Sequence, residues 1–159
     1  MTAMPRERPT ALNKAMDYLA ARPLSEMELL AKLRRAGYSD AECDSAIAEC
    51  QRCHYLNDEQ LTSDCVEYLH QRNLGARQIR QKLLRRGLDG ERISELLADS
   101  PEDELDAARR AMEGKLRSLT RETDPRKKRE KLFRFMANRG FAPSLIFKVM
   151  NEITDDNGD

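Results

Sequence analysis

Residues 22–38 read RPLSEMELLAKLRRAGY and hold the signals of one complete helix. Ser25 is followed three residues later by Glu28, which is the spacing of a capping box. Two leucines then follow four residues apart and would lie on one helix face. Gly37 closes the pattern, because glycine readily adopts the left-handed conformation that ends a helix. The stretch therefore predicts a short, capped helix with one apolar face.

The same pattern occurs twice more in the chain. Gly37, Gly87 and Gly140 are spaced 50 and 53 residues apart. Apolar residues lie eight and four positions before each glycine, and six and ten positions after it, so each glycine stands between two amphipathic helices. A capping residue or a proline follows each glycine within three positions and predicts the next helix start. We therefore assign these three glycines a structural role.

A further helix precedes each of these pairs, near residues 11–21, 58–72 and 102–121. Gly75 is expected to separate the second of these helices from the next. The chain is thus predicted to be all-α, with three tandem three-helix repeats that form an elongated, curved array, because small repeats gain core by stacking on their neighbours. The expected divisions are a flexible segment 1–9, repeats at 10–56, 57–100 and 101–154, and an acidic flexible tail 155–159.

The composition supports a helical protein and excludes several classes. Ala, Glu, Lys, Leu and Arg supply 80 of the 159 residues, a share typical of helix-rich chains. Val, Ile and Thr total only 13, too few for a large sheet. No apolar run is long enough to cross a membrane, and the first residues lack the apolar core of a signal peptide. We expect a cytoplasmic protein with reduced cysteines.

The charge is balanced overall but unevenly distributed. The chain holds 28 basic and 28 acidic residues. Residues 76–150 carry 19 basic and 12 acidic side chains, a net charge of +7. The densest cluster, residues 126–131, reads RKKREK. A solvated helix face explains such a cluster as well as a contact with phosphates or with an acidic partner does.

Four stretches resemble the RecX family, the regulators of the RecA recombinase. Residues 22–38 look like that family's first repeat, and Tyr-Leu-Asn-Asp at 55–58 resembles its Tyr-Leu-Asp-Asp junction. Residues 68–88 are similar to the second repeat and residues 131–141 to the third. The ordered set spans about residues 10–152. One departure is Gln60-Leu61, where family members usually carry Arg-Phe.

The resemblance implies a non-enzymatic modulator with no cofactor. Such a protein would bind RecA and the RecA–single-stranded-DNA filament, lodge in the filament groove and inhibit filament extension, ATP hydrolysis and strand exchange in DNA repair and recombination. We expect a monomer that contacts no membrane. The alternative is an independent nucleic-acid-binding helical repeat that binds DNA directly. The scarcity of aromatic residues argues against base stacking and favours the first reading.

The partner-binding residues are expected on the solvent side of the second helix in each repeat. Arginine there can grip a carboxylate or a phosphate with two parallel hydrogen bonds, although each of these side chains could equally be merely solvated. The candidates are Arg34, Arg35, Arg77, Arg80, Lys82, Arg85, Arg86, Arg126, Lys127, Lys128 and Arg129.

Chemistry of other kinds is weakly supported. Residues 50–54 read CQRCH, which matches a c-type haem motif, but such attachment needs export. Cys50 and Cys53 could share a zinc ion, yet a second ligand pair at the usual spacing is missing. Cys43 and Cys65 fit apolar positions of the repeat, where a thiol packs as a small hydrophobe. A nucleophile–base arrangement is not visible, so no catalytic residue is assigned.

Overall fold

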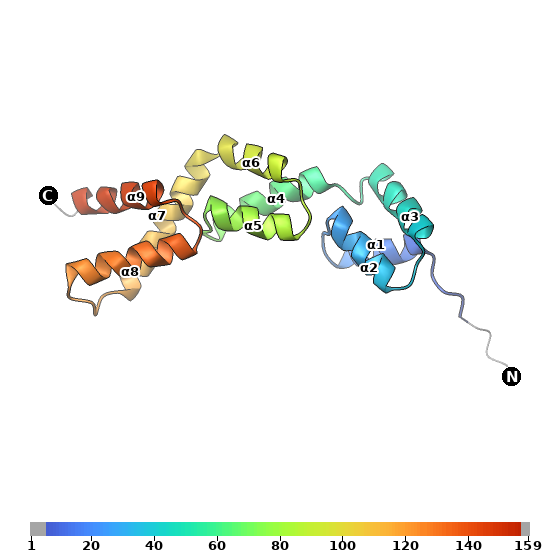
Figure 1. Ribbon diagram of the computed structural model, residues 1–159, viewed down its shortest axis with the longest axis horizontal. Coiled ribbons are helices and arrows are strands. Elements are labelled where there is room, and N and C mark those ends of the chain that lie inside the picture. Colours follow the sequence, from blue (N-terminus) through green and yellow to red (C-terminus); the bar gives the residue numbers. More distant parts are fainter. Residues whose placement is uncertain (1–5, 157–159) are drawn as a thin grey trace. The chain divides into compact units, whose positions relative to one another are not determined.

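The computed structural model describes residues 6–156, and this part of the chain is helical, without strands (Figure 1). The all-α class expected from the sequence is confirmed. The helices are α1 (Ala11–Ala21), α2 (Glu26–Arg35), α3 (Asp40–Arg52), α4 (Asp58–Gln71), α5 (Ala76–Arg85), α6 (Gly90–Asp99), α7 (Pro101–Ser118), α8 (Pro125–Asn138) and α9 (Pro143–Asp156).

The helices begin where the sequence supplies a cap. The Ser25 hydroxyl accepts the backbone N–H of Glu28, and the Glu28 carboxylate accepts that of Ser25, which completes the predicted capping box. Ser39 forms the same box at the start of α3. The carboxylates of Asp89 and Asp124 cap α6 and α8. Each side chain satisfies backbone N–H groups that have no partner within the helix.

The three aligned glycines end helices as predicted. The φ angles of Gly37, Gly87 and Gly140 are 90°, 78° and 97°, all in the left-handed region. Asn73 and His54 also have positive φ, at 62° and 61°. Helix α4 is therefore followed by a left-handed asparagine, and Gly75 lies between α4 and α5 as expected. Asparagine tolerates this conformation better than most residues, because its short side chain can bond locally.

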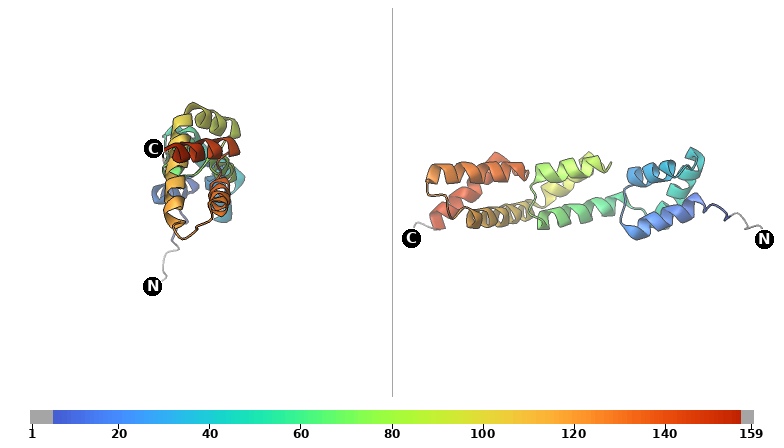
Figure 2. Two further views of the ribbon diagram at one scale, coloured as in Figure 1. Left: turned by 90° about the vertical axis from the view of Figure 1, so that its left-hand side faces the viewer. Right: turned by 90° about the horizontal axis from the view of Figure 1, so that it is seen from below.

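The chain divides into two compact units. Unit 1 comprises residues up to Leu61 together with Arg86–Leu88, and unit 2 comprises Thr62–Arg85 and the residues from Asp89 onward. Helices α1–α3 enclose an apolar core in unit 1 that includes Ala15, Leu29, Leu33, Cys43 and Ile47. Helices α7–α9 enclose another in unit 2 that includes Ala107, Met112, Met136, Phe141 and Ile146 (Figures 1 and 2).

In unit 2, the end of α8 rests against the start of α5. The Gly75 N–H donates to the carbonyl of Arg139 at 2.9 Å, and the Arg77 N–H donates to that of Gly140 at 3.1 Å. The Arg139 guanidinium reaches the carbonyl oxygen of Asn73 at 2.9 Å. A Cβ atom on Gly75 would lie only 2.4 Å from the backbone of Gly140. Glycine is needed at 75 for this close approach.

In unit 1, the same arrangement recurs fifty residues earlier. The hydroxyl of Ser25, at the start of α2, donates to the carbonyl of Arg86. The Arg86 guanidinium reaches the carbonyl oxygen of Pro23 at 3.0 Å, as Arg139 reaches Asn73. Gly87 lies against the Met27 side chain. In each unit, an arginine–glycine pair thus packs against the start of a helix. The pair is Arg86-Gly87 against α2 in unit 1 and Arg139-Gly140 against α5 in unit 2.

The corresponding glycine of the first group of helices has a different neighbour. Position 36, just before Gly37, holds alanine instead of arginine. Its carbonyl accepts a hydrogen bond from the Arg8 guanidinium, which also lies 4.1 Å from the centre of the Tyr38 ring. The Tyr38 hydroxyl donates to the carbonyl of Pro9 at 2.6 Å. Residues 8–9 therefore cover the face that an arginine–glycine pair uses elsewhere.

The terminal segments are described only in part. Residues 1–5 of the expected flexible segment 1–9, and residues 157–159 of the expected tail 155–159, lie outside the described residues. Helix α9 continues to Asp156, so two acidic residues of the expected tail are helical.

Candidate interaction surface

The basic candidates on α2 face solvent. Arg34 and Arg35 are both exposed. Arg34 donates through Nε to the carboxylate of Asp40 at 3.1 Å, with both side chains more than half exposed. An exposed ion pair of this kind adds little stability, about 0–1 kcal/mol. Both arginines can therefore be recruited by a partner at low cost.

On α5, four candidates are exposed and differ in what they already bind. Arg77, Arg80, Lys82 and Arg85 all face solvent. Arg80 is engaged, since its Nη1 donates to the carbonyl of Gly90 at 2.9 Å and to a serine hydroxyl of α6 at 2.8 Å. The other three side chains form no hydrogen bond or ion pair within residues 6–156.

Two of these side chains share a face. Arg77 and Arg85 are two helical turns apart, with Gln81 between them, so they lie in one row on α5. The apolar face of α5, with Ile79 and Leu83, is buried on the other side. Arg77 and Arg85 are thus available to an anion at the surface of unit 2.

Arg86 is placed differently from its neighbours. Its Nε and Nη2 donate to Glu28 Oε1 at 3.0 and 2.8 Å, and only 24% of its side chain is exposed. Burial alone raises the pKa of Glu28, but the hydrogen bonds from Arg86 and from the Ser25 N–H outweigh it and lower this pKa. Glu28 also pairs with Arg22 at 3.1 Å. Arg86 therefore holds unit 1 together, and it is less open to a partner than the sequence suggested.

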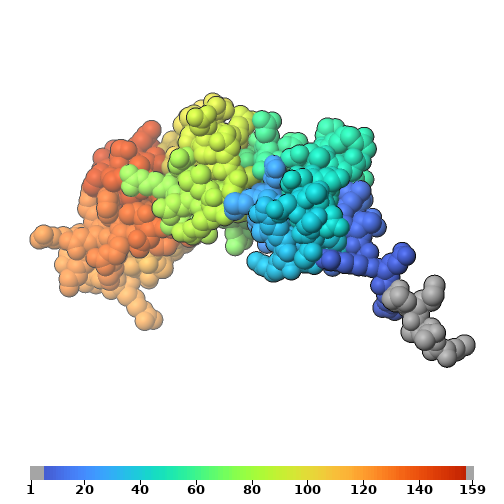
Figure 3. Space-filling model, turned by 45° about the vertical axis from the view of Figure 1, so that its right-hand side comes forward, coloured from blue at the N-terminus to red at the C-terminus, as the bar shows by residue number. Residues whose placement is uncertain are grey.

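The four candidates Arg126–Arg129, which begin the densest cluster, lie at the start of α8. Asp124 caps this turn by accepting the N–H of Arg126 at 3.0 Å. The Arg126 side chain is 88% exposed and lies 3.6 Å from the carboxylate of Glu130. The side chains of Lys127, Lys128 and Arg129 form no ion pair with any residue the structure describes. Figure 3 shows side chains projecting from the surface in the orange region of the chain, which includes this turn.

Four basic charges near a helix start are electrostatically unfavourable in isolation. The exposed N–H groups of a first turn carry partial positive charge and repel cations. Of these four side chains, only Arg126 has an ion-pair partner among the described residues. An anionic partner would relieve the repulsion, so the chemistry of this turn favours phosphate or carboxylate binding.

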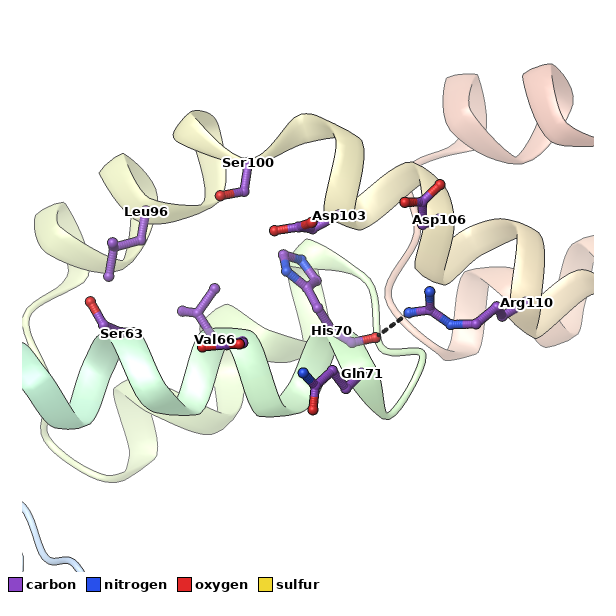
Figure 4. A pocket seen from close by; sticks show the side chains of 10 residues that line it. Ser63, Val66, His70, Gln71, Leu96, Ser100, Asp103, Asp106 and Arg110 are labelled. Carbon is purple, nitrogen blue, oxygen red and sulfur yellow. Dashed lines mark hydrogen bonds between the residues drawn. The ribbon is translucent and has the colours of Figure 1, made fainter.

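Sequence reasoning missed a polar pocket of about 350 Å³ in unit 2. His70 lines it with an exposed fraction of only 3%, and neither ring nitrogen has a hydrogen-bond partner. The imidazole points toward Asp103, while Arg110 donates to the His70 carbonyl at 3.1 Å (Figure 4). Burial lowers the pKa of His70, which favours the neutral ring. A single histidine at an apolar helix spacing gave no sequence signal for this pocket.

The cysteines lie apart from any metal-binding group. Cys43 and Cys50 are buried, whereas Cys53 is exposed at the end of α3. Burial raises the pKa of both buried thiols, which disfavours the thiolate that binds zinc. Among residues 6–156, no three histidine, cysteine or acidic side chains are grouped so that they could hold a metal ion.

None of the described helices is long and apolar enough to span a membrane.

The described part of the molecule is thus an all-helical protein of three-helix groups that expose basic side chains. Comparison with known families agrees with this class. The first three-helix domain of RecX matches residues 11–50, and the third matches residues 102–150.

Individual relatives extend the match over most of the chain. Regulatory protein RecX of Legionella pneumophila (strain Corby) is 31% identical over 144 residues, which cover 90% of this chain and 94% of the relative. Regulatory protein RecX of Haemophilus ducreyi is 33% identical over 132 residues, covering 83% and 85%. The crystal structure of RecX from Lactobacillus salivarius has a similar fold, with a TM-score of 0.81 at 18% identity over 91% of this chain and 94% of that one.

The chain belongs to the RecX family of regulatory proteins, as the sequence resemblance indicated. This is a family of non-enzymatic regulators.

Proposed function

We propose that this protein is a negative modulator of the RecA recombinase. It binds the RecA–single-stranded-DNA filament, lies in the filament groove and inhibits filament extension, ATP hydrolysis and strand exchange. Membership of the RecX family is the observation that carries this proposal. The basic side chains that lack internal partners supply a physical means of binding, because the filament presents both carboxylates and phosphates.

The contacts are assigned to two exposed surfaces of unit 2 and one of unit 1. In unit 2 they are the Arg77–Arg85 row of α5 and the first turn of α8. In unit 1 they are Arg34 and Arg35 on α2. All of these groups are exposed except Lys128, which is half-buried, so a partner can engage them without opening a core. Arg86 acts on binding indirectly, by fixing the structure of unit 1.

Fluorescence anisotropy of a labelled oligonucleotide tests the proposal. The protein is titrated onto RecA filaments assembled on the oligonucleotide with a slowly hydrolysed ATP analogue, and onto the bare oligonucleotide. We expect tight binding to the filament and weak binding to bare DNA. Comparable affinities, with a steep loss as salt rises, would instead indicate an independent nucleic-acid-binding protein. The absence of filament binding would refute the proposal.

A further inference from the structure

Helices α8 and α9 run antiparallel in unit 2 (Figure 1). Side chains of both helices line an open groove. The groove has a volume of about 610 Å³. Its floor consists of Phe133, Ala137, Phe147 and Met150. Its lining also includes Arg126, Arg129, Glu130 and Arg134. An apolar floor is therefore bordered by basic side chains.

The floor includes a large, exposed aromatic side chain. Phe147 is 46% exposed, although it lies in a helix whose other face is fully buried. Its ring centre is 5.3 Å from that of Phe133, and the two rings are tilted by 33°. Single exposed apolar side chains are ordinary, but contiguous apolar patches on soluble proteins commonly mark binding sites.

The rim carries positive charge that the protein does not neutralise. Arg126 and Glu130 pair at 3.6 Å, with exposed fractions of 88% and 60%. The side chains of Arg129 and Arg134 form no hydrogen bond or ion pair with other described residues. The rim thus has a net charge of +2, which complements an anionic ligand.

We propose that this groove binds an amphipathic, acidic helix of a partner protein. Apolar side chains of that helix pack on Phe133 and Phe147, and its carboxylates pair with Arg129 and Arg134. Helices commonly bind in this way, with one apolar face laid into a groove between two helices. The proposal deepens the function proposed above by assigning this surface to protein rather than to DNA.

Nucleic acid fits the groove less well than such a helix. Single strands bind on aromatic side chains whose flat faces are open to stacking bases. Here the two aromatic rings pack on each other, and the rest of the floor is aliphatic. A nucleotide there would gain little stacking, whereas leucine-sized side chains would bury the floor completely.

A synthetic helix tests the proposal independently of RecA. The probe is a 16-residue peptide with leucines and one tryptophan at helix-face spacing and glutamates elsewhere. The chain has no tryptophan, so the fluorescence reports on the peptide alone. We expect saturable binding that weakens at least tenfold in Phe147→Gln and in the double variant Arg129→Gln/Arg134→Gln. Tyr68→Gln, which alters an exposed aromatic residue on α4, serves as the matched control, since Tyr68 is 56% exposed and Phe147 46%.

The possible outcomes separate this proposal from the proposed function. Failure of the acidic peptide to bind, or equal binding by wild type and Phe147→Gln with unchanged circular dichroism, overturns the groove assignment. A peptide in which lysine replaces glutamate must bind much more weakly, and equal binding also overturns it. If Phe147→Gln weakens binding of an oligothymidine but not of the peptide, the groove is a nucleic-acid site. If the peptide binds but RecA filaments do not, the groove stands and the RecA proposal fails.

Discussion

Replacing Gly75 by alanine is expected to destabilise unit 2, although the backbone conformation of this residue would admit alanine. Gly75 does not adopt a positive φ, so its backbone does not require glycine. At such a position, Gly→Ala usually stabilises a protein by about 0.4–1 kcal/mol, because it restricts the unfolded chain. The contact with α8 reverses that sign.

The magnitude follows from the distances. The alanine Cβ would lie 2.4 and 2.5 Å from the carbonyl carbon and oxygen of Gly140, which are backbone atoms. The two segments must therefore separate by about 1 Å to reach ordinary contact distances. That shift breaks the 2.9 Å and 3.1 Å hydrogen bonds to Arg139 and Gly140. Each is worth about 1 kcal/mol, and overpacking strain adds more, so the expected loss is about 2–3 kcal/mol.

Urea unfolding followed by circular dichroism measures this loss. Gly114→Ala is the matched control, because this glycine lies inside α7 and a Cβ there would meet no atom within 4 Å. The control is expected to raise the free energy of unfolding by about 1 kcal/mol. A Gly75→Ala protein as stable as wild type, or more stable, would show that the α5–α8 contact is not tight.

Three further results are expected. Arg86→Gln lowers the free energy of unfolding by about 2 kcal/mol at pH 7, because Glu28 loses a half-buried partner. The folded-state pKa of Glu28 lies below its ordinary 4.5, so acid titrations should show the difference in stability above pH 4.5 and its decline as the pH falls through the lowered pKa. The double reversal Arg77→Glu/Arg85→Glu leaves thermal unfolding within about 1 °C of wild type but weakens filament binding at least tenfold, and undiminished binding would remove this row from the interface. Burial holds the pKa of His70 below its ordinary 6.5, so the unfolded chain takes up a proton first and the free energy of unfolding falls as the pH drops below 6.5. His70→Gln should flatten this dependence of stability on pH between pH 7 and 5, and an unchanged dependence would assign it to other groups.

Much of the fold could be predicted from local signals. The capping box of Ser25 and Glu28 and the left-handed Gly37 follow from physical rules that act within a few residues. Periodic apolar spacing identified the buried leucines of α2 for the same reason. Such signals fix where helices begin, where they end and which face is buried.

The contacts between helix groups could not be predicted in this way. The sequence predicts that Gly75 separates α4 from α5, which it does, but its close contact with the backbone of Gly140, 65 positions away in sequence, has no local signal. Arg86 was assigned to the solvent side, yet Glu28 and the Pro23 carbonyl hold it. One sequence signal was available: arginine precedes the glycine in the second and third groups, and alanine does so in the first. The His70 pocket had no such signal, because its lining comes from three separate helices.

The most direct test of the account is the rate at which RecA hydrolyses ATP on single-stranded DNA in the presence of this protein. Substoichiometric amounts are expected to inhibit hydrolysis strongly, and the protein alone should hydrolyse no ATP. The Arg77→Glu/Arg85→Glu variant should inhibit less than wild type at every concentration. An unchanged RecA rate with a molar excess of folded protein would contradict the proposed function.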